Sequence, residues 1–564
     1  MFKNKTVNFK DLLVSYFSME IGIHPKIPTY SGGLGVLAGD MLRSCADLEL
    51  PVIGVTLLYK KGYFKQKINS SGEQVEEEMH WNPEEFMKLF SNKITVKMEG
   101  RDVKVRAWLY EVRGVTGHVN PIIFLDTNLL ENSEEDRKIT QQLYGSDDKY
   151  RLSQEIILGI GGVRMLESLK CKNLRKYHMN EGHSALLGLE LYQKLKSTNS
   201  DAMATVREKC VFTTHTPVPA GHDQFDKTLA EQMIPEMLTD DIKNELFLNG
   251  KLNMTFLGLR FSEYINGVAK KHGEVSRSMF PGYHIESITN GIHSQFWTTS
   301  SLRKLFDKYL KGWEGDPFSL RYVLSIPKEE IWQAHMEAKR LLTNFVNKNY
   351  GVEMNPDIFT IGFARRAATY KRGDMLFSDI ERLIKIAKKS KGLQIIYAGK
   401  AHPRDYEGKQ LIKRIIEKMN SVKDQIKVCY MENYDIETAQ VLIPGVDVWL
   451  NTPMRPKEAS GTSGMKAAHN GVPHFSTLDG WWLEGHIENV TGWSIGSHPM
   501  ISKEANHDED VEDMYTKLEY IIIPKFYDDH SSWLDIMRHA IAINGSFFNT
   551  HRMVQQYVLN AYFE

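Results

Sequence analysis

Few cysteines, almost no net charge and no long apolar run mark this sequence, and each lack excludes a class of protein. Its four cysteines in 564 residues, Cys45, Cys171, Cys210 and Cys429, lie far apart without a CxxC pair. That pattern favours free thiols in a reducing compartment. Lys and Arg number 70 against 71 Asp and Glu, so the formal charge is −1, and nothing attracts the chain as a whole to nucleic acid.

The chain also lacks a segment that would take it into a membrane. No apolar run approaches the ~20 residues of a membrane span, and the N-terminus, MFKNKTVNFKDLL, has no apolar stretch typical of a signal peptide. We therefore expect a cytoplasmic protein that binds neither nucleic acid nor membrane. A homo-oligomer is compatible with the sequence.

The second half of the chain has the clearest pattern of secondary structure. Short apolar runs predict strands at 357–365, 393–400, 426–432 and 446–453, and helical spacing follows at 374–390 and 407–419. Strands that alternate with helices predict a parallel sheet covered on both faces. In the first half, strands are expected at 12–20, 51–59 and 209–217, and helices at 38–48 and 155–169.

A chain of this length is expected to form more than one core, because cores stop growing near ~250–300 residues. We predict an N-terminal Rossmann-like domain over 1–300, a crossover region over 301–356 and a C-terminal Rossmann-like domain over 357–502. The crossover contains a strong helix at 327–351, and a helical tail over 503–564 is expected to pack back on the N-terminal domain. Two doubly wound domains that face a central cleft suit a ligand bridging them.

Three motifs carry candidate chemistry. The glycine-rich segment Ser31–Gly35 precedes a helix, where backbone amides favour an anion. Arg365, Arg366, Lys371 and Arg372 follow an expected strand, where cations suit phosphate. The small-residue loop 458–466 ends at Lys466, whose amine is a candidate for a Schiff base. Taken alone, each motif also has a structural interpretation. The glycine-rich segment is compatible with a simple turn, the cationic segment with a solvated basic turn, and Lys466 with a lysine on the surface.

Read together, the motifs resemble one family. EASGTSGMKAAHNGVPHFSTLDG (458–480) is similar to the pyridoxal-phosphate lysine segment of the α-glucan phosphorylases, which act on glycogen, starch or maltodextrin. Further similar segments follow in the same order: YFSMEIG (16–22), the glycine-rich stretch 31–68, HMNEGHSAL (178–186), TTHTP (213–217), ITNGI (288–292) and AGKAHP (398–403). The resemblance implies the GT-B glycosyltransferase fold, an α/β architecture of two Rossmann-like domains.

It also implies an activity and a role for each matching residue. The family cleaves α-1,4-glucans with inorganic phosphate and releases α-D-glucose 1-phosphate with retention. By similarity, Lys466 holds pyridoxal 5'-phosphate. The other expected contacts are Thr462, Ser463 and Arg365 for the cofactor phosphate; Gly33, Arg366 and Lys371 for the substrate phosphate; and His215, Asn290, Glu458, Ser460 and Gly461 for the glucosyl unit. Glu20 and Leu34 are expected in the substrate site, and the role of Glu20 there is the least specific.

The implied mechanism assigns an unusual task to the cofactor. Its phosphate acts as the proton shuttle, because the second pKa of a phosphate monoester is ~6. Clustered cations offset the repulsion between that phosphate and the substrate phosphate. No pair of protein carboxylates is required, in contrast to a glycoside hydrolase.

The sequence departs from the family in several places. Asp435 stands where arginine is expected, Gly464 replaces a common asparagine and Ala368 a common histidine. The chain is shorter than the animal and plant members and has no long N-terminal extension, which predicts a constitutive enzyme. Trp481 and Trp482 suit either a sugar-stacking platform or core packing.

Two other functions compete with this interpretation. A nucleotide-sugar-dependent glycogen or starch synthase shares the glycine-rich loop and the cationic turn, but Lys466 stands where those enzymes carry a second glutamate. A non-catalytic glucan-binding protein has no need of Lys466, Arg366, Lys371 and Gly33. A metal site at His178 and His183 is not expected, because the two histidines are five residues apart and HExxH needs four.

Overall fold

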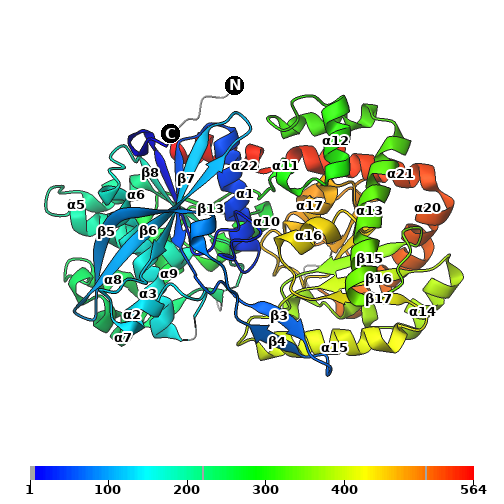
Figure 1. The fold of residues 1–564 in the computed structure, drawn as a ribbon, viewed down its shortest axis with the longest axis horizontal. Helices are drawn as coiled ribbons and strands as arrows, with labels where there is room; N and C mark the ends of the chain where they lie inside the picture. Colours follow the sequence, from blue (N-terminus) through cyan, green and yellow to red (C-terminus); the bar gives the residue numbers. More distant parts are fainter. Residues whose placement is uncertain (1–6, 146, 219–220, 502–504, 564) are drawn as a thin grey trace. The chain divides into compact units, whose positions relative to one another are not determined.

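The computed structural model describes residues 7–145, 147–218, 221–501 and 505–563, and the chain divides into two compact units (Figure 1). The first unit is Met1–Phe64, Glu78–Thr289 and Thr550–Glu564. The second unit is Lys65–Glu77 and Asn290–Asn549. Each unit has its own central sheet, which places the fold in the α/β class expected from the sequence.

The first unit is built on a nine-stranded sheet. Its order is β14 (Glu286–Ser287), β13 (Tyr264–Gly267), β9 (Cys210–Thr213), β8 (Lys176–Asn180), β1 (Val14–Ser18), β2 (Val52–Leu57), β7 (Val119–Asp126), β6 (Arg101–Arg113) and β5 (Lys88–Met98). The strands from β14 to β7 are parallel, and β6 and β5 add antiparallel. Strand β1 is buried along its whole length, as expected for a strand with helices on both faces.

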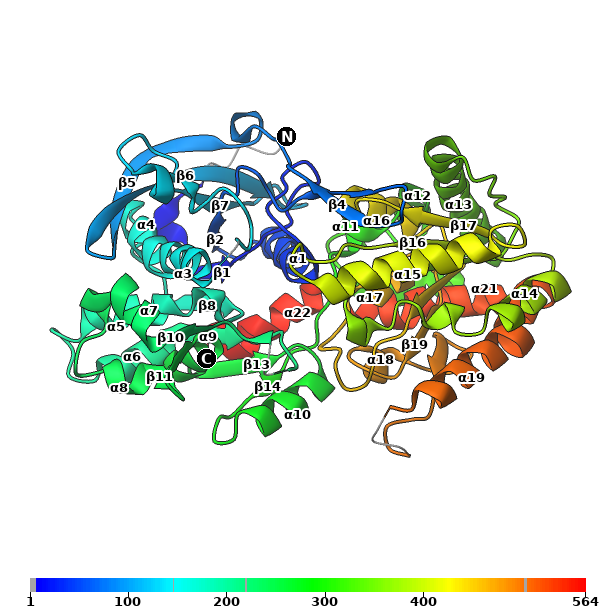
Figure 2. The same ribbon diagram turned by 90° about the horizontal axis from the view of Figure 1, so that it is seen from below.

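Helices cover this sheet, and one of them comes from the end of the chain. They are α1 (Gly33–Asp47), α2 (Glu134–Lys138), α3 (Asp148–Ile156), α4 (Gly162–Ser168), α5 (Leu186–Leu195), α6 (Ala202–Lys209), α7 (Lys227–Met233), α8 (Lys243–Leu246), α9 (Met254–Phe261), α10 (Lys270–Met279) and α22 (Thr550–Tyr557). Helix α22 lies beside α1 (Figure 2), where the Ser44 and Thr550 hydroxyls are 2.6 Å apart. A small sheet, β10 (Gln224–Asp226), β12 (Lys251–Asn253) and β11 (Phe247–Leu248), completes the unit.

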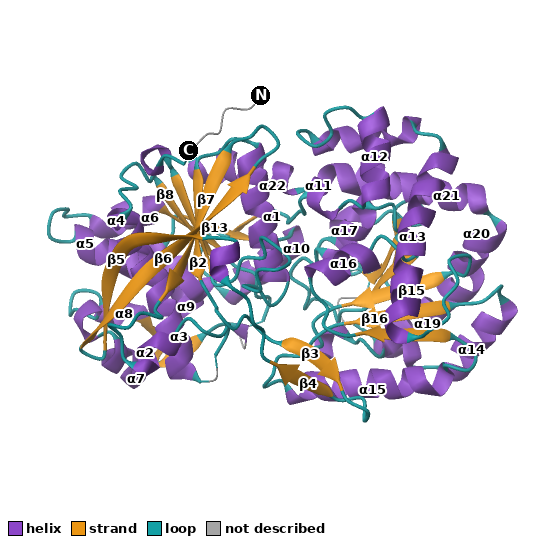
Figure 3. Cartoon of the chain, in the orientation of Figure 1, coloured by secondary structure: helices purple, strands orange, loops and turns teal. Residues whose placement is uncertain are grey.

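The second unit is built on a six-stranded, wholly parallel sheet (Figure 3). Its order is β17 (Lys427–Met431), β16 (Gln394–Ala398), β15 (Thr360–Ala364), β18 (Val448–Asn451), β19 (His474–Thr477) and β20 (Gly492–Ile495). Its helices are α11 (Ser294–Trp297), α12 (Ser300–Tyr309), α13 (Lys328–Tyr350), α14 (Ile380–Lys389), α15 (Tyr406–Val422), α16 (Ile436–Leu442), α17 (Ser463–His469), α18 (Trp482–Gly485), α19 (His507–Lys517), α20 (Ile523–Asp528) and α21 (His530–His539).

A hairpin from early in the chain also belongs to the second unit. Strands β3 (Lys65–Ile68) and β4 (Gln74–Glu77) pair antiparallel. The Gln66 amide donates to the Gly399 carbonyl at 2.7 Å, and the Gln74 amide to the Ala401 carbonyl at 2.9 Å. Both contacts are buried, so the hairpin is fixed at the carboxyl end of β16.

The structure confirms the expected strands of the second half as β15, β16, β17 and β18. The helix expected at 327–351 is α13, which ends at Gly351 in the left-handed conformation, with φ 65°. Helix α1 begins at Gly33, earlier than the expected 38, because tight packing of Gly35 and Gly39 outweighs their low helix propensity. The glycine-rich segment is therefore a helix start.

The units cut the chain differently from the segments expected at 300, 356 and 502. Residues 290–300 lie in the second unit, and so does most of the helical tail. Trp533 of α21 stacks on Trp493 of β20, with ring centroids 5.7 Å apart, so this helix covers the second sheet. Only the part from Thr550 onward joins the first unit. Among the residues described, no helix has the length and apolar character to span a membrane.

Candidate active site

Lys466 lies in the middle of the short helix α17, buried against a tryptophan. The loop after β18 leads into this helix, and the Trp449 indole of β18 donates to the Ser463 hydroxyl at 3.1 Å. Lys466 is 7% exposed, and its Nζ is 3.6 Å from the ring centroid of Trp297 in α11. The surface-lysine interpretation is therefore wrong.

Helix α17 is fastened to α11, which fixes Lys466 relative to Trp297. The side-chain amide of Asn470, the residue that follows the last turn of α17, donates to the Trp297 carbonyl at 2.8 Å. Its oxygen accepts from the Thr299 amide at 2.8 Å, and His469 contacts the Ser294 hydroxyl at 3.0 Å. Burial lowers the pKa of His469 to about 4, so the ring is neutral and this contact is a hydrogen bond between uncharged groups.

The cationic turn after β15 meets the loop after β18 at one carboxylate. Arg365 Nη2 lies 2.7 Å from Glu458 Oε2, and Lys371 Nζ contacts the same oxygen. We call Arg365, Lys371 and Glu458 the cation cluster. Burial alone would raise the pKa of Glu458, but the charges of Arg365 and Lys371 outweigh it and lower that pKa to about 2. The cluster therefore carries one net positive charge at neutral pH. Arg366, next in sequence, is exposed.

The carboxylate of Asp479 binds the backbone of the loop that contains Glu458. Its Oδ2 accepts from the Glu458 amide at 2.9 Å, and its Oδ1 accepts from the Gly480 amide at 2.9 Å. The Trp481 amide donates to the Ser460 carbonyl at 2.9 Å. Gly480 has φ 56°, and a Cβ there would lie 2.4 Å from that carbonyl. The turn 479–481 thus clamps the segment 458–460.

The electrostatics of Asp479 are opposite to those of Glu458. Burial raises the pKa of Asp479 to about 7; the amides of Glu458 and Gly480 act against this shift, and the Glu458 charge adds to it. Glu458 and Asp479 are linked by a hydrogen bond from the Glu458 amide to the Asp479 carboxylate, yet their carboxyl groups ionise in quite different pH ranges. Neither Asp479 nor Trp297 stood out in the sequence, since only the fold brings them to Lys466 and Glu458.

The residues around Lys466 fit a polar, anionic cofactor. Several buried side-chain atoms have no hydrogen-bond partner within the described chain: Ser460 Oγ, Arg365 Nη1, Asn451 Oδ1 and His474 Nδ1. Buried polar atoms in native proteins are almost always paired, so a set of orphans beside a buried lysine and a positive cluster points to a ligand with oxygens. No group of three or more potential metal ligands occurs among the described residues.

In the first unit, the four glycines of the helix start divide into two kinds. A Cβ at Gly32 or Gly33 would meet no atom within 4 Å. A Cβ at Gly35 would lie 2.8 Å from Glu20 Oε2, and one at Gly39 only 2.1 Å from the Gly22 carbonyl. Gly35 and Gly39 are therefore required by packing, while Gly32 and Gly33 leave the first helical amides open to an approaching anion.

His215 follows β9 in the first unit and is held by two neighbours. Its backbone amide donates to Glu181 Oε2 at 2.7 Å, and its Nε2 contacts Asn180 Oδ1 at 2.6 Å. Burial lowers the pKa of His215 to about 3, so the ring is neutral. The amide and Nε2 of His215 are thus already paired within the chain. The backbone carbonyl is the group of His215 that we expect to contact a substrate.

Comparison with known proteins decides the family. The family model described as carbohydrate phosphorylase matches residues 29–112 and 239–492. The chain is 39% identical to the maltodextrin phosphorylase of Thermococcus litoralis, over 97% of this chain and 70% of that protein. It is 35% identical to the glycogen phosphorylase of Aquifex aeolicus, over 97% and 86%. The chain belongs to the carbohydrate phosphorylase family. An uncharacterized protein of Methanocaldococcus jannaschii is 32% identical, over 97% of this chain and 99% of that protein.

Membership confirms the sequence-based assignment to a glycosyltransferase of the phosphorylase type with the GT-B fold. The structure also explains two departures from the family pattern. At Gly464 a Cβ would lie 2.7 Å from the His474 ring and 2.8 Å from Trp481, so no asparagine fits. Asp435 caps α16, its Oδ1 accepting from the Thr438 amide at 2.8 Å. Nothing in the structure explains Ala368.

Two sequence features of the phosphorylase have structural roles. Trp481 and Trp482 are 1% and 0% exposed, so the sugar-platform alternative is wrong and core packing is correct. His178 lies between the Tyr562 hydroxyl, at 2.6 Å from Nδ1, and the Thr213 hydroxyl, at 2.8 Å from Nε2. It joins the C-terminal segment to the sheet of the first unit.

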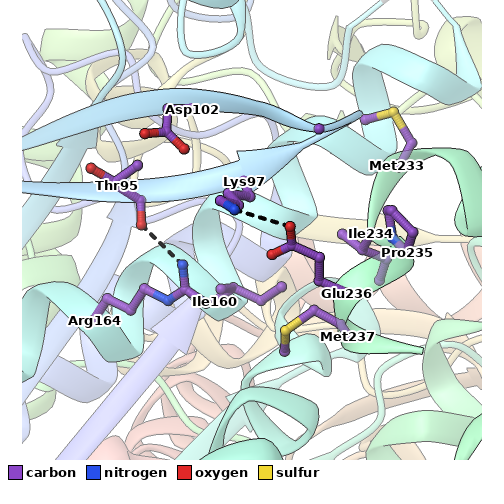
Figure 4. Close-up of a pocket in the computed structure, with 11 residues that line it drawn as sticks. Thr95, Lys97, Asp102, Ile160, Arg164, Met233, Ile234, Pro235, Glu236 and Met237 are labelled. Atoms are coloured by element: carbon purple, nitrogen blue, oxygen red, sulfur yellow. Dashed lines mark hydrogen bonds and ion pairs between the residues drawn. The ribbon is translucent and has the colours of Figure 1, made fainter. Parts of the chain in front are cut away.

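A cavity of about 370 Å³ in the first unit lies apart from all these residues (Figure 4). Its charged lining is already paired. Lys97 Nζ is 3.0 Å from Glu236, and Arg164 binds Glu190 at 2.8 Å and the Thr95 carbonyl at 2.9 Å. It contains none of the site residues expected from the sequence.

Proposed function

We propose that this chain is an α-1,4-glucan phosphorylase that transfers the terminal glucosyl unit of a glucan to inorganic phosphate. The product is α-D-glucose 1-phosphate with retained configuration. The observation that carries the proposal is the buried Lys466 at the end of a loop whose Glu458 is ion-paired to Arg365 and Lys371. The named functions of the maltodextrin and glycogen phosphorylases support it.

Lys466 is the residue that would hold pyridoxal 5'-phosphate. Thr462 and Ser463 stand at the start of α17, where their amides would face the cofactor phosphate, and Arg365 has a free Nη1 for it. When bound, the cofactor supplies a phosphate monoester that gives and takes a proton near pH ~6. Burial of the amine against Trp297 would keep water away from the lysine that holds the cofactor.

The substrate phosphate would be held by Lys371, Arg366 and the amides of Gly33 and Leu34. Lys371 is 4.6 Å from the ring centroid of Tyr370 and contacts Glu458, so its ammonium is held in one place. A point charge held in place stabilises developing negative charge without reorganisation. Gly33 brings backbone amides close because no side chain intervenes.

The glucosyl unit would be bound by Glu458, Ser460, Gly461, Asn290 and the His215 carbonyl. Glu458 is ionised throughout the neutral range, because its pKa is about 2, so it acts as a hydrogen-bond acceptor and does not donate a proton. Ser460 Oγ is buried without a partner in the described chain and is free to bind a sugar hydroxyl. Gly461, with φ 84°, presents its amide where a side chain would be strained.

The partners and compartment follow from the same proposal. The partners are an α-1,4-glucan or maltodextrin and inorganic phosphate. We place the enzyme in the cytoplasm, supported by four cysteines that are all free and buried.

The direct test is an assay of the purified chain supplied with cofactor. With maltodextrin and phosphate we expect α-glucose 1-phosphate, and near-ultraviolet absorbance from bound cofactor. With ADP-glucose or UDP-glucose and no phosphate we expect no chain elongation. Nucleotide-sugar-dependent elongation by colourless protein would support the synthase alternative and refute the proposal, and glucan binding without either reaction would support a non-catalytic role.

A further inference from the structure

Tyr144 lies between α2 and α3 in a backbone conformation that its surroundings enforce. Its φ is 61°, the left-handed region, which costs a non-glycine residue about 1 kcal/mol. The next residue is Gly145, where a Cβ would lie 1.6 Å from the Tyr150 ring. Tyr150 is itself fixed, since its hydroxyl donates to the Lys138 carbonyl and its amide to Asp147 Oδ1, both at 2.8 Å. These contacts restrict the backbone conformation at Tyr144 and Gly145.

That conformation delivers the Tyr144 hydroxyl to Glu20. The hydroxyl donates to Glu20 Oε1 at 2.5 Å. The other oxygen, Oε2, accepts from the Ser31 amide at 2.5 Å and from the Gly32 amide at 3.1 Å. Glu20 is 2% exposed. Its carboxylate thus accepts hydrogen bonds from the chain itself, and the substrate contact expected for Glu20 stays a prediction.

Glu20 accepts hydrogen bonds at the N-terminus of α1, where the local N-cap residue has no side chain to do so. Gly32 occupies the N-cap position of α1 and has no side chain to accept from the first turn. A carboxylate near a helix start is favourable, because the amides there have no partner inside the helix. Glu20 takes the amides of Ser31 and Gly32 and leaves those of Gly33 and Leu34, the first two residues of the helix, for another anion.

The aromatic ring of Tyr144 lies against the positive charge of Arg151. The Arg151 guanidinium carbon is 4.4 Å from the Tyr144 ring centroid. Arg151 donates to Asp223 Oδ2 from Nε at 3.0 Å and from Nη2 at 2.6 Å, and lies 3.1 Å from Glu155. Burial and the Asp223 charge raise the pKa of Glu155 well above its usual range, despite the opposing Arg151 charge. Arg151 therefore lies between the carboxyl groups of Asp223 and Glu155.

A cation over the ring draws electron density from the phenol, which makes its hydroxyl a better donor to a carboxylate. His183, 3.4 Å from Asp223, is neutral because burial lowers its pKa to about 3.

We propose that Tyr144 is a positioning residue for the glycine-rich helix start: through Glu20 it fixes the amides of Ser31 and Gly32, and thereby the direction in which Gly33 and Leu34 present theirs to the substrate phosphate. This inference rests on the proposed phosphorylase function. It adds a residue outside every motif that the sequence singled out.

The test is Tyr144→Phe, which removes the hydroxyl and keeps the ring beside Arg151. A hydrogen bond to a charged group is lost, so we expect the KM for phosphate to rise about tenfold and kcat to change less than threefold. The KM for maltodextrin and the absorbance of the bound cofactor should stay within twofold of wild type. Tyr59→Phe is the matched control, because its hydroxyl is buried nearby and donates only to the Met19 carbonyl, at 2.7 Å.

A double-mutant cycle separates positioning from a general loss of structure. If Tyr144 acts through Glu20, then Glu20→Gln and Tyr144→Phe together should raise the KM for phosphate no more than Glu20→Gln alone, within about twofold. Glu20→Asp, whose shorter side chain cannot span both contacts, should give the same rise if Tyr144→Phe does not fold.

Three results would overturn the inference: an unchanged KM for phosphate in an active Tyr144→Phe enzyme, an equal rise in Tyr59→Phe, or fully additive effects in the cycle. A wild-type chain without phosphorolysis would instead refute the proposed function, which is a separate outcome.

Discussion

Glu458 is an anion held between two cations, and its charge offsets one of the two positive charges of Arg365 and Lys371. Removing one member of such a group leaves the other charges buried without compensation, which costs about 3–5 kcal/mol. The same unbalanced cations would then attract phosphate more strongly. The role of Glu458 in the absence of ligand is therefore electrostatic as well as structural.

We predict that Glu458→Gln melts at a lower temperature than wild type in phosphate-free buffer. We also predict that phosphate raises its melting temperature more than it raises that of wild type, because the anion replaces the missing charge. Thermal unfolding with and without phosphate, at constant ionic strength, measures both. Equal phosphate shifts in the two proteins would show that the cation cluster does not bind the anion.

Asp479 gives a second prediction, in the pH dependence of stability. Its folded pKa, about 7 because of burial, lies above the usual unfolded value of ~4. Its stabilising contribution is therefore fully present below the unfolded pKa and is lost as the pH rises through about 7. Asparagine cannot ionise, so wild type should lose up to about 3 kcal/mol relative to Asp479→Asn between pH 5 and 7. Melting curves of the two proteins that stay parallel from pH 5 to 8 would contradict the assignment.

Some site residues could be predicted from the sequence and some could not, for a physical reason. Lys466, Glu458, Arg365 and Lys371 lie in compact motifs whose residue types already indicate anion chemistry. Trp297 is far from Lys466 in sequence, and long-range contacts of His469 and Asn470 with the segment 294–299 bring the two together. Asp479 and Tyr144 act through single long-range hydrogen bonds, which leave no periodicity or composition to detect.

At the scale of elements, the start of α1 shows how one motif serves two purposes. The sequence predicted an anion-binding turn, and the structure has a helix start in which two glycines pack and two stay open. Sequence periodicity located α13 almost to the residue because its ends carry strong signals, Pro327 and Gly351. Strands β5, β6, β19 and β20 were not anticipated, since short or half-exposed strands have weaker patterns.

This division of the glycines predicts opposite phenotypes for one kind of substitution. Gly39→Ala places a methyl group 2.1 Å from the Gly22 carbonyl and should destabilise the first unit by about 2–3 kcal/mol. Gly33→Ala meets no atom, so the melting temperature should stay within about 2 °C of wild type, while the KM for phosphate rises because the methyl group blocks the amides. Melting curves and phosphate titrations of both variants test this. A stable Gly39→Ala, or a fully active Gly33→Ala, would refute the corresponding half.

At the scale of the whole molecule, the chain passes from the first unit to the second and returns to the first at its end. The segment from Thr550 onward belongs to the first unit, although residues 290–549 belong to the second. Sequence amphipathicity predicted that the tail is helical, but it could not say which core each helix covers, because any apolar face suits either core. The expected α/β class was predictable, since alternating strands and helices leave few other architectures.

Deleting residues 550–564 should therefore unfold the first unit. The segment buries Met553, Val554, Tyr557 and Tyr562, each worth about 1.5–3 kcal/mol. We expect the truncated chain to be degraded rapidly in limited proteolysis, with cleavage within 78–289. Tyr562→Phe, which loses only the hydroxyl bonded to His178, should resist proteolysis nearly as well as wild type. Equal resistance of truncated and intact chains would contradict the assignment of this segment.

The central claim is that Lys466 holds pyridoxal 5'-phosphate, and one measurement tests it directly. The intact chain, supplied with the cofactor, is reduced with borohydride, digested and mapped by mass spectrometry. We predict a pyridoxyl-phosphate adduct on Lys466, and no adduct on the buried Lys339, which serves as an internal control. An unmodified Lys466 in fully supplied protein, or an adduct on another lysine, would contradict the account.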